Sequence, residues 1–274
     1  MSSPPSPPGG TCSPDDVSHR LPPAPAVRYG THDEQVANLH LPAGEGGPWP
    51  AVMLIHGGFW RERWDRTLTT PLAHDLAARG YAVWNVEYRR VGHEEGGYPG
   101  TLGDVAAALA ALARLPEVDP ERIVAVGHSA GGHLALWLAG ERSAGARLAA
   151  AVSLAGVADL RQAYSDRLGD GAVAAFLGEV TGEELDARLR AASPLERLGS
   201  IPRALVHGTL DDVVPVSQSR DYAARVGAAG IAVDLVELDG ADHFDVVDPG
   251  GPAWQAVAGA IARLVPPRGA ILGR

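Results

Sequence analysis

Short runs that are apolar at every position alternate along this chain with longer segments of helical pattern, and this alternation strongly limits the possible folds. Residues 51–55 (AVMLI) form the clearest run, because a strand with one face in water would alternate apolar and polar side chains. The other strands that we predict lie at 81–86, 123–126, 149–154, 204–207 and 233–238. Helical patterns occupy 71–79, 104–115, 132–140 and 254–264. The sequence therefore predicts an α/β fold, with a mostly parallel sheet covered by helices on both faces.

Two segments depart from this pattern. Residues 35–41 alternate apolar with polar side chains, which indicates a strand of an antiparallel hairpin at the sheet edge. Residues 156–202 are polar and helical, with short helices expected at 170–177 and 183–191. We predict that this second segment is a small helical cap insertion, which leaves the sheet and covers a site.

The chain has 274 residues, which is enough to bury a substantial core. Residues 1–25 are rich in Pro, Ser and Gly and poor in large apolar side chains, so we predict that they are disordered. Residues 26–274 are expected to form one α/β domain. Cys12 is the only cysteine, which excludes an intramolecular disulfide. The first residues lack the features of a secretory signal, and no apolar run reaches the roughly 18 residues of a membrane span, so we expect a cytoplasmic protein.

The charged residues exclude several kinds of chemistry. All 23 basic side chains are arginine, and the net charge is -10. Without lysine, the chain cannot form a Schiff base with a carbonyl compound or build a phosphate-binding loop with its lysine. The negative charge disfavours nucleic acids and anionic membranes as partners, because the protein would not neutralise their phosphates. We therefore expect a small-molecule substrate; the sequence does not indicate the oligomeric state.

A candidate nucleophile lies where a predicted strand meets a predicted helix. Residues 127–131 read GHSAG, a G-x-S-x-G sequence, and they follow the apolar run 123–126 directly. In this setting the serine occupies a strained turn with its hydroxyl exposed, and the glycines leave room for that turn. The pattern predicts that Ser129 is the nucleophile.

A serine nucleophile needs a base, and the base needs an acid that orients it. Of the ten histidines, only His243 follows the last predicted strand, in a loop at the edge of the sheet where ligand sites gather. Asp211 and Asp212 both follow the strand at 204–207, and either carboxylate is a candidate for the acid. His207 ends that strand and is expected to pack or bond locally.

Residues 56–60 (HGGFW) form a third element of the predicted site, directly after the strand at 51–55. Acyl transfer develops a negative oxygen, which backbone N–H groups must stabilise. Small residues after a strand let the backbone approach a substrate, so we expect the N–H groups of Gly58, Phe59 and Ala130 to form this oxyanion hole. The sequence contains no metal-ligand spacing such as H-E-x-x-H, so we predict neither a metal nor another cofactor.

Together these motifs resemble the α/β-hydrolase fold, and the resemblance covers nearly all of 27–264. In that family the H-G-x-x-D-x-x-V-P pattern carries the catalytic acid at its first aspartate, which implies Asp211 here. The HGGFW motif is similar to that of kynurenine formamidases (arylformamidases), where the second glycine and the next residue form the oxyanion hole. The resemblance thus implies the same roles for Gly58 and Phe59. The segment 87–89 (EYR) looks like one common in related esterases.

The predicted function is a serine hydrolase that cleaves a small carboxylic ester or an activated amide through an acyl-enzyme. An aryl formamide such as N-formylkynurenine is the most specific substrate that the resemblance implies. An exopeptidase-like hydrolase of the same fold is one alternative. A catalytically silent binding protein is another, although the complete Ser, His and Asp set argues against it.

Aromatic side chains near the motifs predict the character of the substrate pocket. We expect Trp60 and Tyr88 to bind substrate, because both belong to segments that border the predicted nucleophile. An aromatic wall suits an aryl-bearing or medium-length acyl substrate. Further arginines follow the strands in the same region, and one of them could bind a substrate carboxylate: Arg61, Arg63, Arg66, Arg89 and Arg90.

Overall fold

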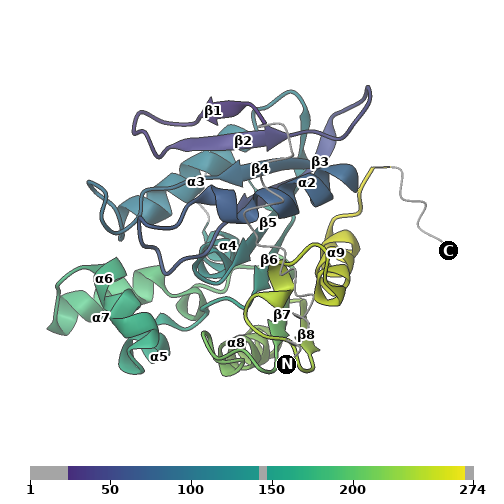
Figure 1. Cartoon of the computed structure of the whole chain (residues 1–274). Coiled ribbons are helices and arrows are strands. Elements are labelled where there is room, and N and C mark those ends of the chain that lie inside the picture. Colours follow the sequence, from purple (N-terminus) through teal and green to yellow (C-terminus); the bar gives the residue numbers. More distant parts are fainter. Residues whose placement is uncertain (1–23, 142–146, 269–274) are drawn as a thin grey trace, which may run out of the picture.

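A single mixed sheet forms the centre of the described chain (Figure 1). The computed structural model describes residues 24–141 and 147–268. The sheet order is β1-β2-β4-β3-β5-β6-β7-β8. The strands are β1 (Ala26–Arg28), β2 (Val36–His40), β3 (Trp49–Ile55), β4 (Ala82–Val86), β5 (Val118–His128), β6 (Ala150–Leu154), β7 (Arg203–Gly208) and β8 (Val233–Leu238).

Strand direction follows the predicted pattern. β4, β3, β5, β6, β7 and β8 run parallel in that spatial order. At one edge, β2 pairs antiparallel with both β4 and β1. The prediction of a mostly parallel sheet with an antiparallel edge hairpin is therefore confirmed. The predicted disordered segment 1–25 lies outside the described residues except for its last two positions.

Helices cover both faces of the sheet, and alternate residues of β3, β4 and β5 contribute to two separate cores. Val52 and Leu54 of β3 pack with α2 and α9, whereas Met53 and Ile55 pack with α3 and α4 on the opposite face. α8 packs against α4 and β7. This alternation is what a strand buried on both faces requires. The helices are α2 (Thr70–Ala78), α3 (Gly100–Leu112), α4 (Ala130–Gly140), α8 (Ser217–Ala228) and α9 (Pro252–Leu264), with the short turns η1 (Arg66–Thr69) and η3 (Asp245–Val247).

The segment between β6 and β7 leaves the sheet as a group of helices, seen at the lower left of Figure 1. It contains α5 (Leu160–Ser165), α6 (Leu168–Leu177), α7 (Gly182–Ala192) and the turn η2 (Pro194–Glu196). α6 and α7 were expected, whereas α5 was not. The segment is tied to α4, because the indole N–H of Trp137 donates to the Ala191 carbonyl at 3.0 Å. Its role as a cap remains a prediction.

Candidate active site

Ser129 stands at a sharp turn between β5 and α4. Its backbone is strained, with φ 55° and ψ -118°, which is rare for a residue with a side chain. The turn is held from both sides. The Ser129 N–H donates to the Leu154 carbonyl of β6 at 2.8 Å, and the Ser129 carbonyl accepts from the His133 N–H at 3.1 Å. The parallel sheet thus fixes the serine at the carboxyl ends of its central strands.

The glycines on either side of Ser129 are required by close backbone approach. A Cβ atom at Gly127 would lie 2.0 Å from the Gly131 carbonyl oxygen, and one at Gly131 would lie 2.1 Å from that of Ile55. Real Cβ atoms do not approach so closely, and here the obstacle is backbone that cannot rotate away. The G-x-S-x-G pattern is therefore a steric requirement of this turn.

His243 and Asp211 come from two neighbouring loops and meet at the same edge of the sheet. Asp211 follows β7 and His243 follows β8, and the parallel pairing of these strands brings the loops together. The Nδ1 atom of His243 donates to the Oδ2 atom of Asp211 at 2.7 Å. Asp212, the other carboxylate considered for the acid, is exposed. His243 and Ser129 line one pocket, so the three predicted side chains converge.

The Asp211 side chain is buried but well supplied with donors. Its Oδ1 atom accepts the N–H groups of Val213 and Val214, at 2.9 and 2.8 Å. Burial alone would raise the pKa of this carboxyl group. The hydrogen bonds from His207, His243 and the Val214 N–H outweigh burial and hold the pKa well below its usual range. Asp211 is therefore a carboxylate over the working pH range of most proteins.

His128, the residue before Ser129, supports the loop that carries His243. Its ring is buried, lies 4.6 Å from the His243 ring, and donates through Nε2 to the His243 carbonyl at 2.9 Å. Burial, and then the neighbouring His243, lower the pKa of His128 to about 3. The ring stays neutral at physiological pH and acts as a hydrogen-bond donor.

The pocket above Ser129 is small and mainly apolar. Its volume is about 160 Å³, which is below the roughly 300 to 1,000 Å³ of sites for drug-sized ligands. Large apolar side chains exposed to solvent surround it, with Trp64 40% and Phe244 62% exposed. The lining residues are Gly57, Gly58, Phe59, Arg63, Trp64, Leu68, His128, Ser129, Val213, His243 and Phe244. Such a pocket accepts a compact apolar group beside Ser129.

The loop 57–60 runs past Ser129 in an uncommon conformation. Gly58, Phe59 and Trp60 have φ angles of 105°, 54° and 56°, so three successive residues lie in the left-handed region. For a residue with a side chain, this conformation costs about 1–3 kcal/mol. A Cβ atom at Gly58 would lie 2.5 Å from that of Trp64. Gly58 and Phe59 line the pocket with Ser129, and their role as oxyanion donors stays a prediction.

The His56 ring holds the peptide between Gly57 and Gly58 through the carbonyl oxygen of Gly57. The Nδ1 atom of His56 donates to the Gly57 oxygen at 2.8 Å. A trans peptide is planar, and its C=O and N–H groups point in opposite directions. Fixing the Gly57 oxygen therefore also fixes the direction of the Gly58 N–H. The His56 carbonyl, in turn, accepts the Tyr88 hydroxyl at 2.9 Å.

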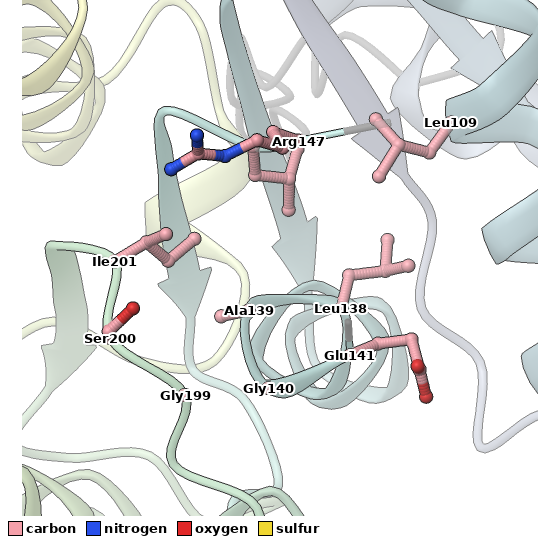
Figure 2. Close-up of a pocket in the computed structure, with 10 residues that line it drawn as sticks. Leu109, Leu138, Ala139, Gly140, Glu141, Arg147, Gly199, Ser200 and Ile201 are labelled. Atoms are coloured by element: carbon pink, nitrogen blue, oxygen red, sulfur yellow. The ribbon is translucent and has the colours of Figure 1, made fainter. Parts of the chain in front are cut away.

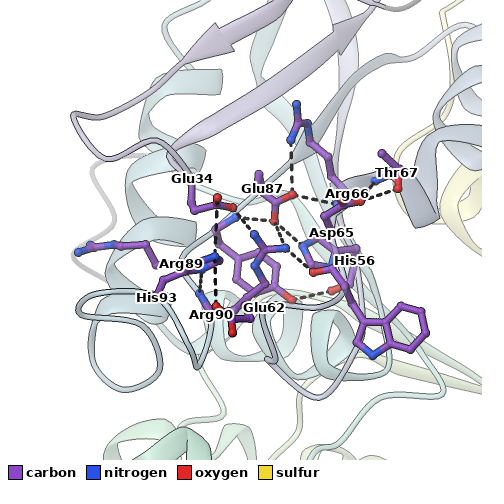
Figure 3. Close-up of polar contacts among 12 residues, drawn as sticks. Glu34, His56, Glu62, Asp65, Arg66, Thr67, Glu87, Arg89, Arg90 and His93 are labelled. Carbon is purple, nitrogen blue, oxygen red and sulfur yellow. Dashed lines mark hydrogen bonds and ion pairs between the residues drawn. The ribbon is translucent and has the colours of Figure 1, made fainter.

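A buried cluster of charged side chains lies behind this loop (Figure 3). Glu87 accepts from the Nε2 atom of His56 at 2.8 Å and from the Arg66 N–H at 3.0 Å, and forms an ion pair with Arg90 at 3.0 Å. Burial would raise the pKa of Glu87, but these donors and positive charges lower it. Arg90 also donates to the Trp64 carbonyl and pairs with Glu34. The cluster therefore links the loop 57–60 to the pocket wall.

The prediction that Trp60 and Tyr88 bind substrate is contradicted, because the exposed fraction of both side chains is 0%. Trp60 stacks on Phe176 at 4.8 Å and donates its indole N–H to His133 Nδ1 at 3.2 Å. Tyr88 stacks on His56 at 4.4 Å, behind the loop. The left-handed turn directs Trp60 inward, and the hydroxyl bond to the His56 carbonyl keeps Tyr88 there.

Several pocket residues were not assigned from the sequence. Leu68 and Val213 approach the pocket only through tertiary packing, and no local pattern marks them. Phe244 directly follows His243, and that position could have suggested it. The structure also places Trp64 in the pocket wall.

A larger cavity, of about 290 Å³, lies at the other end of α4 (Figure 2). Its lining includes Leu138, Glu141, Arg147 and Ser200. It is about 15 Å along the helix from Ser129, given a rise of about 1.5 Å per residue. Among the described residues, its lining contains no histidine, so this cavity offers no base for a serine nucleophile.

No group of His, Cys, Asp or Glu side chains within 24–141 and 147–268 is arranged to hold a metal ion. In the same ranges, no helix has the length and apolar character needed to cross a bilayer.

Comparison with known proteins gives the following matches. The profile of the BD-FAE family matches residues 37–226, a range that includes Ser129 and Asp211 and ends before His243. The chain is 30% identical over 250 residues to esterase LipC of Mycobacterium tuberculosis, covering 77% of this chain and 57% of LipC. It is 29% identical over 255 residues to a probable isoprenylcysteine alpha-carbonyl methylesterase, ICMEL1, of Oryza sativa subsp. japonica, covering 81% and 57%. The chain thus spans little more than half the length of either relative.

A solved structure described as a truncated form of a carbohydrate esterase from gut microbiota superposes with a TM-score of 0.78. The superposition covers 89% of this chain and 97% of that one, at 19% sequence identity. At this level of identity the likeness concerns the fold alone.

Proposed function

Because the chain belongs to the BD-FAE family and has the α/β-hydrolase fold, we propose that it is a serine hydrolase that cleaves a small carboxylic ester. The observation that carries this proposal is the convergence of three side chains. Ser129 stands on a strained turn, and His243, hydrogen-bonded to Asp211 at 2.7 Å, lines the same pocket. In this arrangement, Ser129 is the nucleophile, His243 the base and Asp211 the acid that orients it.

The proposed reaction has two halves. Ser129 Oγ attacks the ester carbonyl carbon and transfers its proton to His243 Nε2, and the carbonyl oxygen becomes negative. The N–H groups of Gly58, Phe59 and Ala130 stabilise this oxygen. The C–O bond to the alcohol then breaks, and His243 gives the proton to the departing oxygen. Water, activated by His243, attacks the acyl-enzyme in the same way and releases the acid.

The pocket supports a substrate with compact apolar groups. A volume of about 160 Å³ leaves no room for a large group, and the exposed rim formed by Trp64, Leu68 and Phe244 suits an alkyl or aryl part. The proposed substrate is a small molecule. The expectations of a cytoplasmic location, and of no nucleic acid or membrane partner, remain predictions.

An aryl formamide that carries a carboxylate is the more specific form of the proposal. Arg63 lines the pocket, with its guanidinium 5.4 Å from the Trp64 ring. Its neighbours are committed elsewhere, since Arg61 donates to the Gly169 carbonyl at 2.6 Å and Arg66 bonds to Asn38 and Glu87. A guanidinium at the pocket edge can bind a substrate carboxylate through two parallel hydrogen bonds.

The test is hydrolysis of short p-nitrophenyl esters beside N-formylkynurenine, by the wild type and Ser129→Ala. Ester hydrolysis that is lost in Ser129→Ala supports the proposal, and equal hydrolysis by both proteins rejects it. The formamide form predicts a kcat/KM for N-formylkynurenine above that for the esters, and an Arg63→Gln variant in which only the formamide reaction is weakened. A kcat/KM well below that of the esters rejects the formamide.

A further inference from the structure

A second buried histidine touches the Asp211 carboxylate. His207 lies near the end of β7, and the exposed fraction of its side chain is 0%. Its Nε2 atom lies 3.1 Å from the Oδ2 atom of Asp211, the same oxygen that accepts from His243 at 2.7 Å. One carboxylate oxygen thus lies between two imidazole rings. The mechanism described above uses only His243.

The surroundings of His207 define which of its nitrogens carries a proton. Nε2 faces the Val214 carbonyl oxygen at 2.9 Å as well as Asp211 Oδ2, and both oxygens can only accept. Nε2 therefore donates. On the other side of the ring, Nδ1 lies 2.7 Å from the hydroxyl of Ser219 in α8. The ring is held at both nitrogens and cannot turn.

These contacts fix Asp211 in two ways. His207 contacts Oδ2 directly. It also holds the carbonyl of Val214, whose N–H donates to Oδ1 at 2.8 Å. Burial works against the ionised carboxyl group and raises its pKa. Among the effects that lower this pKa, the hydrogen bond from His207 is the largest, ahead of that from His243.

We propose that His207 is a positioning residue of the hydrolytic site, which holds the Asp211 carboxylate in the orientation that bonds His243. The inference rests on the proposed serine hydrolase function. A catalytic group works only when the residues around it hold its geometry to within a fraction of an ångström. Asp211 contacts His207, and His207 contacts Ser219, so the contacts behind the site continue into the protein interior.

A matched pair of variants tests this role. In His207→Gln, the side-chain amide takes the place of Nε2 and can still donate to Asp211. In His207→Asn, the amide takes the place of Nδ1 and cannot reach the carboxylate. Both variants remove the ring, so they share the cost of lost packing. We expect kcat to fall up to about 100-fold in His207→Asn, with KM changed less than about twofold, and to recover largely in His207→Gln.

A spectroscopic measurement reports the same contact without turnover. The proton between His243 Nδ1 and Asp211 Oδ2 should give a downfield proton resonance in the wild type and in His207→Gln. We expect it to weaken or shift in His207→Asn. Equal kcat values in the two variants, together with an unchanged resonance, overturn the inference. If neither variant folds, Ser219→Ala takes their place, and an unchanged resonance and kcat there overturn it.

The two proposals fail in different ways. A wild type that hydrolyses no ester refutes the serine hydrolase function, while the resonance still reports whether His207 positions Asp211. An active wild type with kcat equal in His207→Asn and His207→Gln refutes only the role of His207.

Discussion

The contact between His56 and the Gly57 carbonyl makes a prediction in which activity and stability separate. In His56→Asn, the side-chain amide takes the position of Nδ1, so the bond to the Gly57 oxygen can persist and the contact with Glu87 is lost. In His56→Gln, the amide takes the position of Nε2, so the contact with Glu87 can persist and the bond to Gly57 is lost. Each variant therefore removes one of two contacts, both 2.8 Å long in the wild type.

The expected magnitudes follow from what each contact does. Loss of the Gly57 bond frees the peptide whose N–H is the proposed Gly58 donor. Removing one oxyanion donor costs about 100- to 1,000-fold in kcat, or about 3–4 kcal/mol of barrier. Loss of the Glu87 contact leaves a buried carboxylate with fewer donors, which costs about 1–3 kcal/mol of unfolding free energy. Arg66 and Arg90 still contact Glu87, so the lower end of that range is expected.

The assays are steady-state hydrolysis of a p-nitrophenyl ester and urea unfolding of the same preparations. His56→Gln should have a low kcat, a nearly unchanged KM and nearly wild-type stability. His56→Asn should have a kcat within several-fold of the wild type and a lower unfolding free energy. The opposite pattern, an active His56→Gln beside an inactive but stable His56→Asn, would refute the idea that this bond aims the Gly58 N–H.

Other positions give simpler expectations. Gly131→Ala should lower the unfolding free energy by about 3 kcal/mol or more, because the added Cβ would meet a carbonyl oxygen at 2.1 Å. Gly103 is an open position in α3, so Gly103→Ala should raise the unfolding free energy by about 0.5–1 kcal/mol in the same urea titration. Burial lowers the pKa of His133 from 6.5 to about 4, so the unfolded chain binds its proton first as the pH falls. The free energy of unfolding should therefore decrease as the pH falls below about 6.5. His133 should account for about 2 kcal/mol of this loss between pH 7 and pH 5, and that part should be absent in His133→Gln. Phe244→Ala should raise KM for an aryl ester about 2- to 10-fold, and Leu41→Ala, exposed outside the pocket lining, should leave it unchanged.

Much of the fold could be predicted because a strand buried on both faces, such as β3, is apolar at nearly every position. The run at 51–55 lies within β3, and the G-x-S-x-G turn lies between a strand and a helix as expected. α8 was not predicted, since half of its buried residues are polar: Gln218 and Ser219 are buried beside Tyr222 and Val226. The amide oxygen of Gln218 accepts two backbone N–H groups between β6 and α5. A polar helix face buried by specific hydrogen bonds leaves no hydrophobic period to detect.

The candidate site was predictable where the backbone dictates the residue type. The glycines around Ser129 and the order of acid and histidine along the chain depend on local geometry and strand direction. The misassigned Trp60 shows the limit of this reasoning, because three successive left-handed residues turn its ring into the core. The second contact of Asp211 was also invisible in the sequence. His207 reaches Asp211 through the fold of one loop, and a pattern of residues does not report that distance.

Fluorophosphonate labelling, followed by mass mapping of the modified peptide, examines the proposed nucleophile without any assumption about the substrate. One adduct per chain on Ser129 of the wild type is expected, with no adduct on Ser129→Ala and much slower labelling of His243→Ala. Ser153 is a matched serine, buried in the neighbouring strand β6, and should stay unmodified in every protein. A wild type that takes up no label, or takes it up at another residue at the same rate in Ser129→Ala, would contradict the proposed hydrolytic site.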